Sequence, residues 1–182
     1  MIPFVVAIGG PAGSGKSTVG RKVASRLGAT FHSVGELFRA EARERSMDLE
    51  AFGRYAETHP EVDRELDRRA LSLARPGVVL EGRVQGVLLR RAGRPVRTVR
   101  VTASREVRVA RLLQRDGGTT EATETKLSER EASERTRYVA LYGIDPELEP
   151  VDLVVDATDS SADEVAETIV RFLRRPVEGP RS

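Results

Sequence analysis

Residues 10–18, GPAGSGKST, have the types and the spacing that bind a polyphosphate. The segment matches G-x-x-x-x-G-K-[ST] in full and lies between a β-branched run and a helical pattern, which is the context that this chemistry requires. Glycines let backbone N–H groups approach phosphate oxygens, and a helix N-terminus adds partial positive charge. Lys16 can then span the β- and γ-phosphates, and the Ser17 hydroxyl can ligate Mg²⁺.

The alternative is a glycine-rich turn that merely precedes a helix, and the complete match with correct flanks disfavours it. We therefore predict an ATP-binding loop. Its members are Gly10, Pro11, Ala12, Gly13, Ser14, Gly15, Lys16, Ser17 and Thr18.

Such a loop occurs in GTPase switches, motor ATPases and small-molecule kinases, so other features must separate these classes. The chain has no N-K-x-D guanine-reading motif, which disfavours a GTPase, and its 182 residues without internal repeats disfavour a motor. A kinase whose acceptor is already phosphorylated needs a second set of cations, because two anionic groups must be brought together.

Candidate cations and acids follow the predicted strands. Ser33 and Arg39 come after the second strand and Arg83 after the third, so all three can face the edge of the sheet where ligands bind. Guanidinium groups at that edge suit an acceptor phosphate, although any single arginine can also be a solvated surface charge. Glu81 can hold Mg²⁺ through water, and the alternative is a strand-terminal surface glutamate.

Three charged residues late in the chain share one helical face. Arg130, Glu134 and Arg137 are spaced i, i+4 and i+7. The two arginines can reach a polyphosphate while Glu134 orients them, or the three can form an exposed ladder of ion pairs.

Strands and helices alternate along the chain in a way that predicts a three-layer α/β fold with a parallel sheet. We expect strands at residues 3–8, 30–33, 78–80, 97–102 and 151–156. We expect helices at residues 16–27, 104–115, 120–142 and 161–173, and a helical run over 35–74 with breaks near Ser46 and before Pro60.

Composition limits the possible partners and location. The 30 basic and 28 acidic residues nearly balance, and aromatic residues make up only 4% of the chain, so a nucleic-acid partner is not expected. The absence of cysteine excludes disulfides and thiolate metal sites. The first apolar stretch, Ile2 to Ile8, is too short to span a bilayer, so we expect no membrane partner and a cytoplasmic location.

The combination of motifs resembles the archaeal-type cytidylate kinases, a branch of the nucleoside monophosphate kinases, over nearly the whole chain. The segments that carry the resemblance are GPAGSGKST at 10–18, SVGELFRAEARERSMDLEAF at 33–52, HPEVDRELD at 59–67, LEGR at 80–83 and REASERTRYVALYGID at 130–145. The third, through its EVDRELD part, and the last of these are more diagnostic than the phosphate loop.

The resemblance implies one P-loop kinase domain over residues 1–182, with a five-stranded parallel sheet flanked by helices. It also implies a helical monophosphate-binding lobe at 35–75, a lid at 117–137 and a monomeric state. The implied reaction transfers the γ-phosphoryl group of ATP to CMP and dCMP, with Mg²⁺ as cofactor and small-molecule nucleotides as partners.

The resemblance also implies a role for each candidate residue. Lys16 and Ser17 handle ATP and Mg²⁺, and Ser33, Arg39 and Arg83 bind the monophosphate. Arg130 and Arg137 act on the transferring phosphoryl group, so that the implied catalytic residues are Lys16, Arg130 and Arg137. Asp63 and Gln85 are implied contacts to the nucleoside.

Two positions leave alternatives open. Asp63 can instead belong to a solvated charge ladder on its helix with Arg64, Asp67 and Arg68. Val84 and Gln85 replace a leucine and a small residue that are common in the family, next to Arg83. A kinase for AMP, UMP or a 5-substituted CMP therefore remains an alternative, as does an inactive nucleotide-binding regulator.

Overall fold

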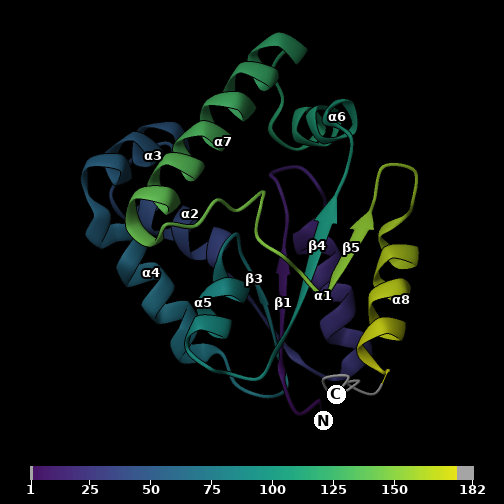
Figure 1. Ribbon diagram of the computed structural model, residues 1–182. Helices are drawn as coiled ribbons and strands as arrows, with labels where there is room; N and C mark the ends of the chain where they lie inside the picture. Colours follow the sequence, from purple (N-terminus) through teal and green to yellow (C-terminus); the bar gives the residue numbers. More distant parts are fainter. Residues whose placement is uncertain (1, 176–182) are drawn as a thin grey trace.

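A computed structural model describes residues 2–175, and its centre is a parallel sheet in the order β2-β3-β1-β4-β5 (Figure 1). Every neighbouring pair of strands is parallel. The strands are β1 (Val5–Gly9), β2 (Thr30–Ser33), β3 (Val78–Glu81), β4 (Val96–Thr102) and β5 (Leu153–Asp156). The predicted five-stranded parallel sheet is confirmed.

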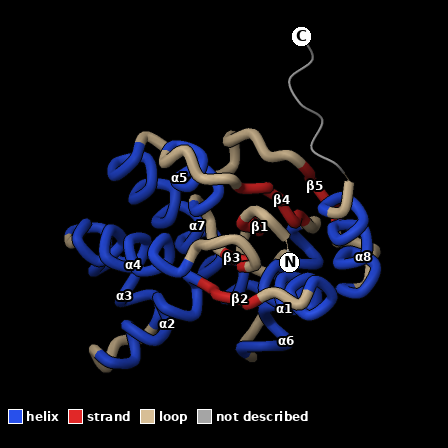
Figure 2. Tube along the Cα trace, turned by 90° about the horizontal axis from the view of Figure 1, so that it is seen from below, coloured by secondary structure: helices blue, strands red, loops and turns tan. Residues whose placement is uncertain are grey.

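Eight helices are described, and they surround the sheet on both faces. They are α1 (Lys16–Leu27), α2 (Val34–Glu44), α3 (Leu49–Thr58), α4 (Pro60–Leu73), α5 (Gln85–Arg91), α6 (Arg105–Asp116), α7 (Thr120–Tyr142) and α8 (Ala162–Leu173). Seen from below, the strands lie between α4 and α5 on one side and α1 and α8 on the other (Figure 2). The three-layer architecture is therefore also confirmed.

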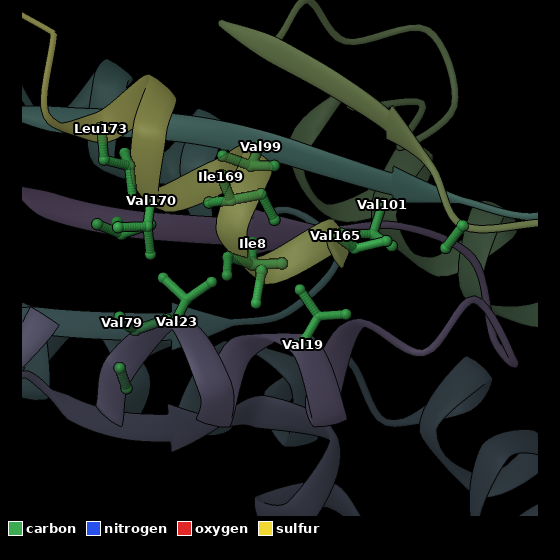
Figure 3. Packing of buried hydrophobic residues seen from close by; sticks show 14 residues of the cluster. Ile8, Val19, Val23, Val79, Val99, Val101, Val165, Ile169, Val170 and Leu173 are labelled. Carbon is green, nitrogen blue, oxygen red and sulfur yellow. The ribbon is translucent and has the colours of Figure 1, made fainter. Parts of the chain in front are cut away.

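Alternate residues of β1 explain why the sheet needs cover on both faces. Val6 and Ile8 are fully buried and pack with Val23 of α1 and Ile169 of α8 (Figure 3). Val5 points to the opposite face, where it belongs to a second cluster that includes residues of α4 and α5. A strand buried on both faces reads as a continuous apolar run, which is how residues 3–8 are recognisable in the sequence.

Helix ends mostly lie where the sequence predicts them. The Ser104 side chain caps α6 by accepting a hydrogen bond from the Val107 N–H, and Thr119 caps α7 by accepting one from Ala122. Gly143 ends α7 in a left-handed conformation with φ 63°, which glycine adopts without strain. The short helix α5 is missing from the sequence predictions, because its N-terminal residue, Val84, offers no side-chain cap.

Helices α2, α3 and α4 lie between β2 and β3 and have a small core of their own. Its centre is Phe52, which is fully buried, together with Leu66 and Ala42. The breaks occur where the sequence predicts them, at Ser46 with φ 55° and at Pro60, the first residue of α4. The long helix α7 packs against α3 and α6 and runs over the carboxyl end of the sheet (Figure 1). Among residues 2–175, no helix combines the length and apolar character needed to cross a membrane.

Candidate functional site

A cleft of about 1360 Å³ opens at the carboxyl end of the sheet. Its floor is the loop at residues 12–18 and the end of β3, and its walls come from α2, α3, α4, α6 and α7. Ligands of parallel α/β sheets bind at this edge. The structure thus places the predicted nucleotide loop, the predicted acceptor residues Arg39 and Arg83, and the predicted catalytic residue Arg130 around one space.

Close packing of the loop against its neighbours requires glycine at two positions. A Cβ atom on Gly10 would lie 2.1 Å from the Val101 carbonyl oxygen, and one on Gly13 would lie 2.7 Å from that of Arg108. The loop leads directly into α1, whose N-terminal residue Gly15 provides no side-chain cap. The first backbone N–H groups of α1 therefore remain available to an anion.

Glu81 lies at the centre of the floor and is only 2% exposed. The Ser17 hydroxyl donates to its Oε2 over 3.2 Å, the Ser33 hydroxyl also donates to Oε2, and the Lys16 Nζ lies 3.7 Å from Oε1. The alternative of a surface glutamate is wrong, because β3 is a central strand whose end is covered by the loop. Burial lowers the pKa of Lys16, and Glu81 opposes that shift.

The oxygens of Ser17 and Glu81 converge on one spot and fit a magnesium ion. A hydroxyl and a carboxylate are hard oxygen donors of the kind that Mg²⁺ prefers, and such an ion usually keeps phosphate and water ligands as well. Residues 2–175 contain no group of three or more acidic or histidine side chains that could hold a metal ion alone. The donor set therefore suits an ion that arrives with a nucleotide.

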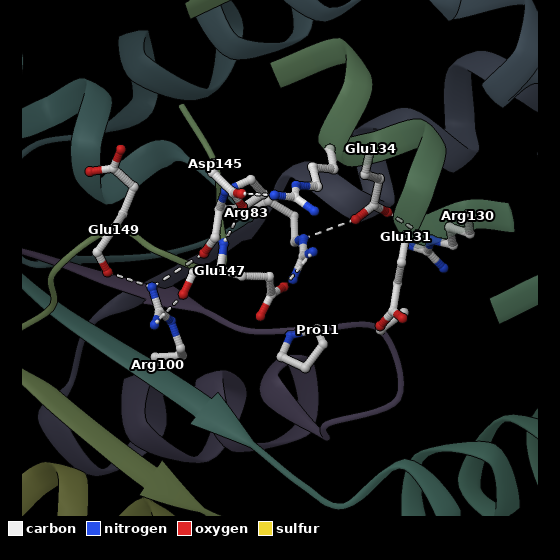
Figure 4. Close-up of polar contacts among 12 residues, drawn as sticks. Pro11, Arg83, Arg100, Arg130, Glu131, Glu134, Asp145, Glu147 and Glu149 are labelled. Carbon is white, nitrogen blue, oxygen red and sulfur yellow. Dashed lines mark hydrogen bonds and ion pairs between the residues drawn. The ribbon is translucent and has the colours of Figure 1, made fainter. Parts of the chain in front are cut away.

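Glu134 joins two of the predicted arginines (Figure 4). Its Oε2 lies 2.9 Å from the Nε of Arg83, and its Oε1 accepts a hydrogen bond from the Nε of Arg130 over 2.8 Å. Glu147 holds the other side of Arg83, 2.9 Å from its Nη2. Burial raises the pKa of Glu134, but Arg130, Arg83 and Lys16 outweigh it and bring the value to about 2. The carboxylate is therefore ionised and fixes both guanidinium groups, and the alternative of an exposed ladder is wrong.

Arg137 does not join this cluster. Its Nε lies 3.5 Å from the Oδ2 of Asp63, and its guanidinium carbon lies 5.0 Å from the centre of the Phe38 ring. The prediction that Glu134 orients Arg137 is wrong, because the carboxylate is already shared by Arg83 and Arg130.

Asp63 and Asp67 are buried, 3% and 2% exposed, so the predicted solvated ladder is also wrong. Its two arginines, Arg64 and Arg68, are exposed, because they lie on the opposite face of α4. The carboxylates instead face α7 and α5, which cover this side of α4.

Gln85 lies behind the wall of the cleft rather than in it. Its side chain is fully buried, its Nε2 donates to Asp67 Oδ1 over 2.6 Å, and its Oε1 accepts from the Val84 N–H over 3.1 Å. The Tyr142 hydroxyl donates to the other oxygen of Asp67 over 2.9 Å. The predicted contact of Gln85 with a nucleoside is corrected accordingly, since its polar atoms are engaged and do not reach the cleft.

Comparison with known proteins agrees with the geometry of the cleft. Residues 5–159 match the model of the cytidylate kinase-like family. The chain belongs to this family. It is 42% identical to the cytidylate kinase of Pyrococcus furiosus over 164 residues, which cover 89% of this chain and 84% of that protein. It is 40% identical to the cytidylate kinase of Methanopyrus kandleri over 172 residues, 90% of this chain and 89% of that protein.

Solved structures support the fold of this family member. An uncharacterised protein from Eubacterium ventriosum matches with a TM-score of 0.64 at 13% identity, over 93% of this chain and 98% of that one. The shikimate kinase of Acinetobacter baumannii, solved with shikimate, matches with a TM-score of 0.60 at 18% identity, over 95% and 93% of the two chains.

Two arginines that the sequence predictions omit brace the loop of this cytidylate kinase-like chain. Arg111 donates from Nη1 to the Ser14 carbonyl over 3.1 Å and from Nη2 to the Ala157 carbonyl over 2.7 Å. Arg108 donates to the Ala12 carbonyl over 3.2 Å. The spacing of Arg108, Arg111 and Arg115 along α6 is a signal that could have indicated a basic helix face beside the loop.

Proposed function

We propose that this chain transfers the γ-phosphoryl group of ATP to CMP, and to dCMP, forming ADP and the nucleoside diphosphate. The observation that carries the proposal is the set of cations opposite the nucleotide loop: Arg39, Arg83 and Arg130 all line the cleft. A protein that only binds ATP has no use for a second anion site. The names and high identity of its curated relatives support cytidylate as the acceptor.

The donor side consists of the loop and the start of α1. Backbone N–H groups and Lys16 bind the phosphates of ATP, and Lys16 neutralises the charge that develops on the transferring group. Ser17, directly, and Glu81, through water, would hold Mg²⁺, which supplies charge neutralisation at the phosphate oxygens.

The acceptor side consists of strand-end and helix residues. Arg39 and Arg83 bind the monophosphate, and Arg130 stabilises the transferring phosphoryl group. Ser33, which the resemblance also assigns to the monophosphate, is buried, donates its hydroxyl to Glu81 and does not line the cleft. Burial lowers the pKa of Arg39, and Arg130 adds to the shift, so two cations repel each other across the same space. An acceptor phosphate relieves that repulsion. The acceptor phosphate is already anionic near neutral pH, so the reaction needs no general base and depends on in-line positioning of the two reacting groups.

The lobe at 35–75 and the lid at 117–137 close over the two nucleotides in this proposal. Both contribute residues to the cleft, for example Phe38 and Arg39 from the lobe and Arg130 from the lid. Closure excludes water, which limits hydrolysis of ATP without transfer. The monomer is sufficient, because one chain provides both sides of the site.

A coupled assay of ADP release tests the proposal. ATP, Mg²⁺ and the protein are combined in turn with CMP, dCMP, UMP, AMP, GMP, dTMP and 5-hydroxymethyl-CMP, and kcat/KM is compared. We expect CMP and dCMP to be the best acceptors. Preference for another base would move the acceptor assignment to that nucleotide, and binding of ATP without turnover on any acceptor would indicate a regulator.

A further inference from the structure

The side chain of Arg100, on β4, holds the backbone of residues 144–150, the segment that leads from α7 to β5. Its Nη1 donates to the Glu147 carbonyl over 3.0 Å, and its Nη2 donates to the carbonyls of Pro146, over 3.2 Å, and Glu149 (Figure 4). Hydrogen bonds from a charged donor are about twice as strong as neutral ones. Segment 144–150 contains no helix or strand, so these bonds fix a stretch of chain that has no regular structure to hold it.

Two further contacts fix the start of segment 144–150. Ile144 is fully buried and packs with Val84. Asp145 pairs with Arg135 of α7 over 2.6 Å, and its Oδ1 accepts a hydrogen bond from the Glu147 N–H over 3.1 Å. The segment is therefore anchored to α7, to the turn after β3 and to β4.

The segment presents the Glu147 carboxylate to Arg83. Glu147 Oε1 lies 2.9 Å from Nη2 of Arg83, and Glu134 Oε2 lies 2.9 Å from its Nε. The third nitrogen, Nη1, makes no hydrogen bond with any group of residues 2–175. Glu134 thus anchors the guanidinium and Glu147 sets its orientation, and one nitrogen remains for an acceptor phosphate.

Arg100 supports this arrangement from outside the cleft. Arg83, but neither Arg100 nor Glu147, lines the cleft. In the sheet, Arg100 lies beside Gly9 of β1, and Ile8 of β1 lies beside Glu81 of β3, so Arg100 and Arg83 flank β1 at the same end. A functional group on a loop needs a rigid scaffold to place it, and a strand inside the sheet is such a scaffold.

We propose that Arg100 is a positioning residue for the acceptor phosphate: it holds segment 144–150, which keeps Glu147 against Arg83 and so orients the guanidinium that receives the phosphate. This inference rests on the proposed function. It also gives a role to the YGID end of the segment at 130–145, which the proposed reaction does not otherwise use.

Arg97 provides a matched comparison on the same strand. It is half-buried like Arg100, and its Nη1 donates to the carbonyls of Phe172 and Leu173 at the end of α8. It lies near the start of β4, whereas Arg100 lies near its end. Both arginines therefore bind backbone carbonyls and support the fold, but the carbonyls that Arg97 binds belong to a helix end away from Arg83.

The test measures KM for CMP and KM for ATP in Arg100→Met, each with the other substrate saturating. We expect KM for CMP to rise about two- to tenfold, the effect of leaving one long side chain unrestrained before binding. We expect kcat and KM for ATP to stay within about twofold, because the lost contact serves acceptor binding alone. Arg97→Met is the control, and it should lower the melting temperature without changing either KM. An unchanged KM for CMP in Arg100→Met, or an equal rise in KM for ATP, overturns the inference.

A double-variant comparison tests whether Arg100 acts through Glu147. In a Glu147→Ala background, Arg100→Met should no longer change KM for CMP, because the carboxylate that it positions is gone. A rise of the same size in both backgrounds overturns the inference. If Arg100→Met does not fold, Arg100→Lys replaces it in both measurements, since an ammonium group lacks the fork that spans three carbonyls. Absence of CMP turnover in the unaltered protein is a different result, because it rejects the proposed function itself.

Discussion

Two ends of the cleft contain buried carboxylates whose pKa values shift in opposite directions. At the phosphate end, burial raises the pKa of Glu134, but Arg130, Arg83 and Lys16 outweigh it and bring the value to about 2. At the other end, where α4 meets α5 and α7, burial raises the pKa of Asp67 to about 7, and the hydrogen bonds from Tyr142 and Gln85 and the charge of Arg137 oppose that shift only in part. Asp63 is intermediate: Arg137 lies beside it, but burial still raises its pKa. The number of cations around a buried acid therefore decides the direction of its shift in this protein.

The same difference suits the two ends to different tasks. A permanently ionised Glu134 holds two guanidinium groups in place for phosphates. Around Asp63 and Asp67, Arg137 is the single cation of residues 2–175 that lies within 4 Å of either carboxylate, so an anion would meet more repulsion than attraction at this end.

The largest expected effect belongs to the phosphate end. Lys16→Ala should lower kcat for every acceptor by about a thousandfold or more, because it removes the ammonium group that neutralises charge on the transferring group in the proposed reaction. Steady-state kinetics with CMP and UMP measures it. Lys22→Ala, on the same helix but paired at the surface with Asp163, is the control and should keep normal kcat. Near-normal turnover in Lys16→Ala would reject the assignment of the loop.

Removing the shared anion tests whether it stabilises the cations. Glu134→Gln should lower the free energy of unfolding by about 3 kcal/mol, because Arg83 and Arg130 would face each other without it. Urea unfolding measures the loss. Added ATP should raise the melting temperature more in this variant than in the unaltered protein, since phosphates replace the missing charge. An equal rise in melting temperature with ATP in the variant and in the unaltered protein would contradict this account.

The end at Asp67 should show the opposite response to pH. The folded-state pKa of Asp67 lies above its ordinary value of 3.8, so the folded state binds the proton more tightly and loses stability as pH rises toward 7 and beyond. Between pH 5 and 8 this loss is about 2–3 kcal/mol. Asp67→Asn removes it, so the variant should gain stability relative to the unaltered protein by that amount over this range. If the free energy of unfolding of the variant and of the unaltered protein varies with pH in the same way, the raised pKa of Asp67 is refuted.

The smallest effect is expected at the rim. Glu147 contacts Arg83 but is about half exposed, so Glu147→Gln should change the free energy of unfolding by less than about 1 kcal/mol. Raising the salt concentration should remove even this difference. A loss as large as that of Glu134→Gln would mean that Glu147, rather than Glu134, holds Arg83.

The sequence predicts the phosphate end of the site far better than the end at Asp63 and Asp67. Loop spacing and strand-end positions identify Lys16, Arg39 and Arg83, because local order along the chain places them at one edge. The burial of Asp63 and Asp67 could not be predicted in this way. Their segment reads as a charged helix face, and only the packing of α5 and α7 against α4 excludes water from two of its acids.

The burial of Gln85 could not be predicted for a related reason. Gly82 lies close to the Gln85 side chain, since a Cβ atom at position 82 would be 2.0 Å from Gln85 Oε1. The turn after β3 therefore folds back onto the start of α5. Neither that turn nor the seven-residue helix has a strong local signal. The fold class, by contrast, follows from buried strands and capped helices that are each visible in the sequence.

Helix α7 carries Arg130 at one position and Arg137 seven residues later without a break. Because the helix is unbroken, the backbone positions of the two arginines keep a separation of about 10 Å along its axis. A shift of α7 as a unit would therefore change the contact of Arg137 with Asp63 and the contact of Glu134 with Arg83 together.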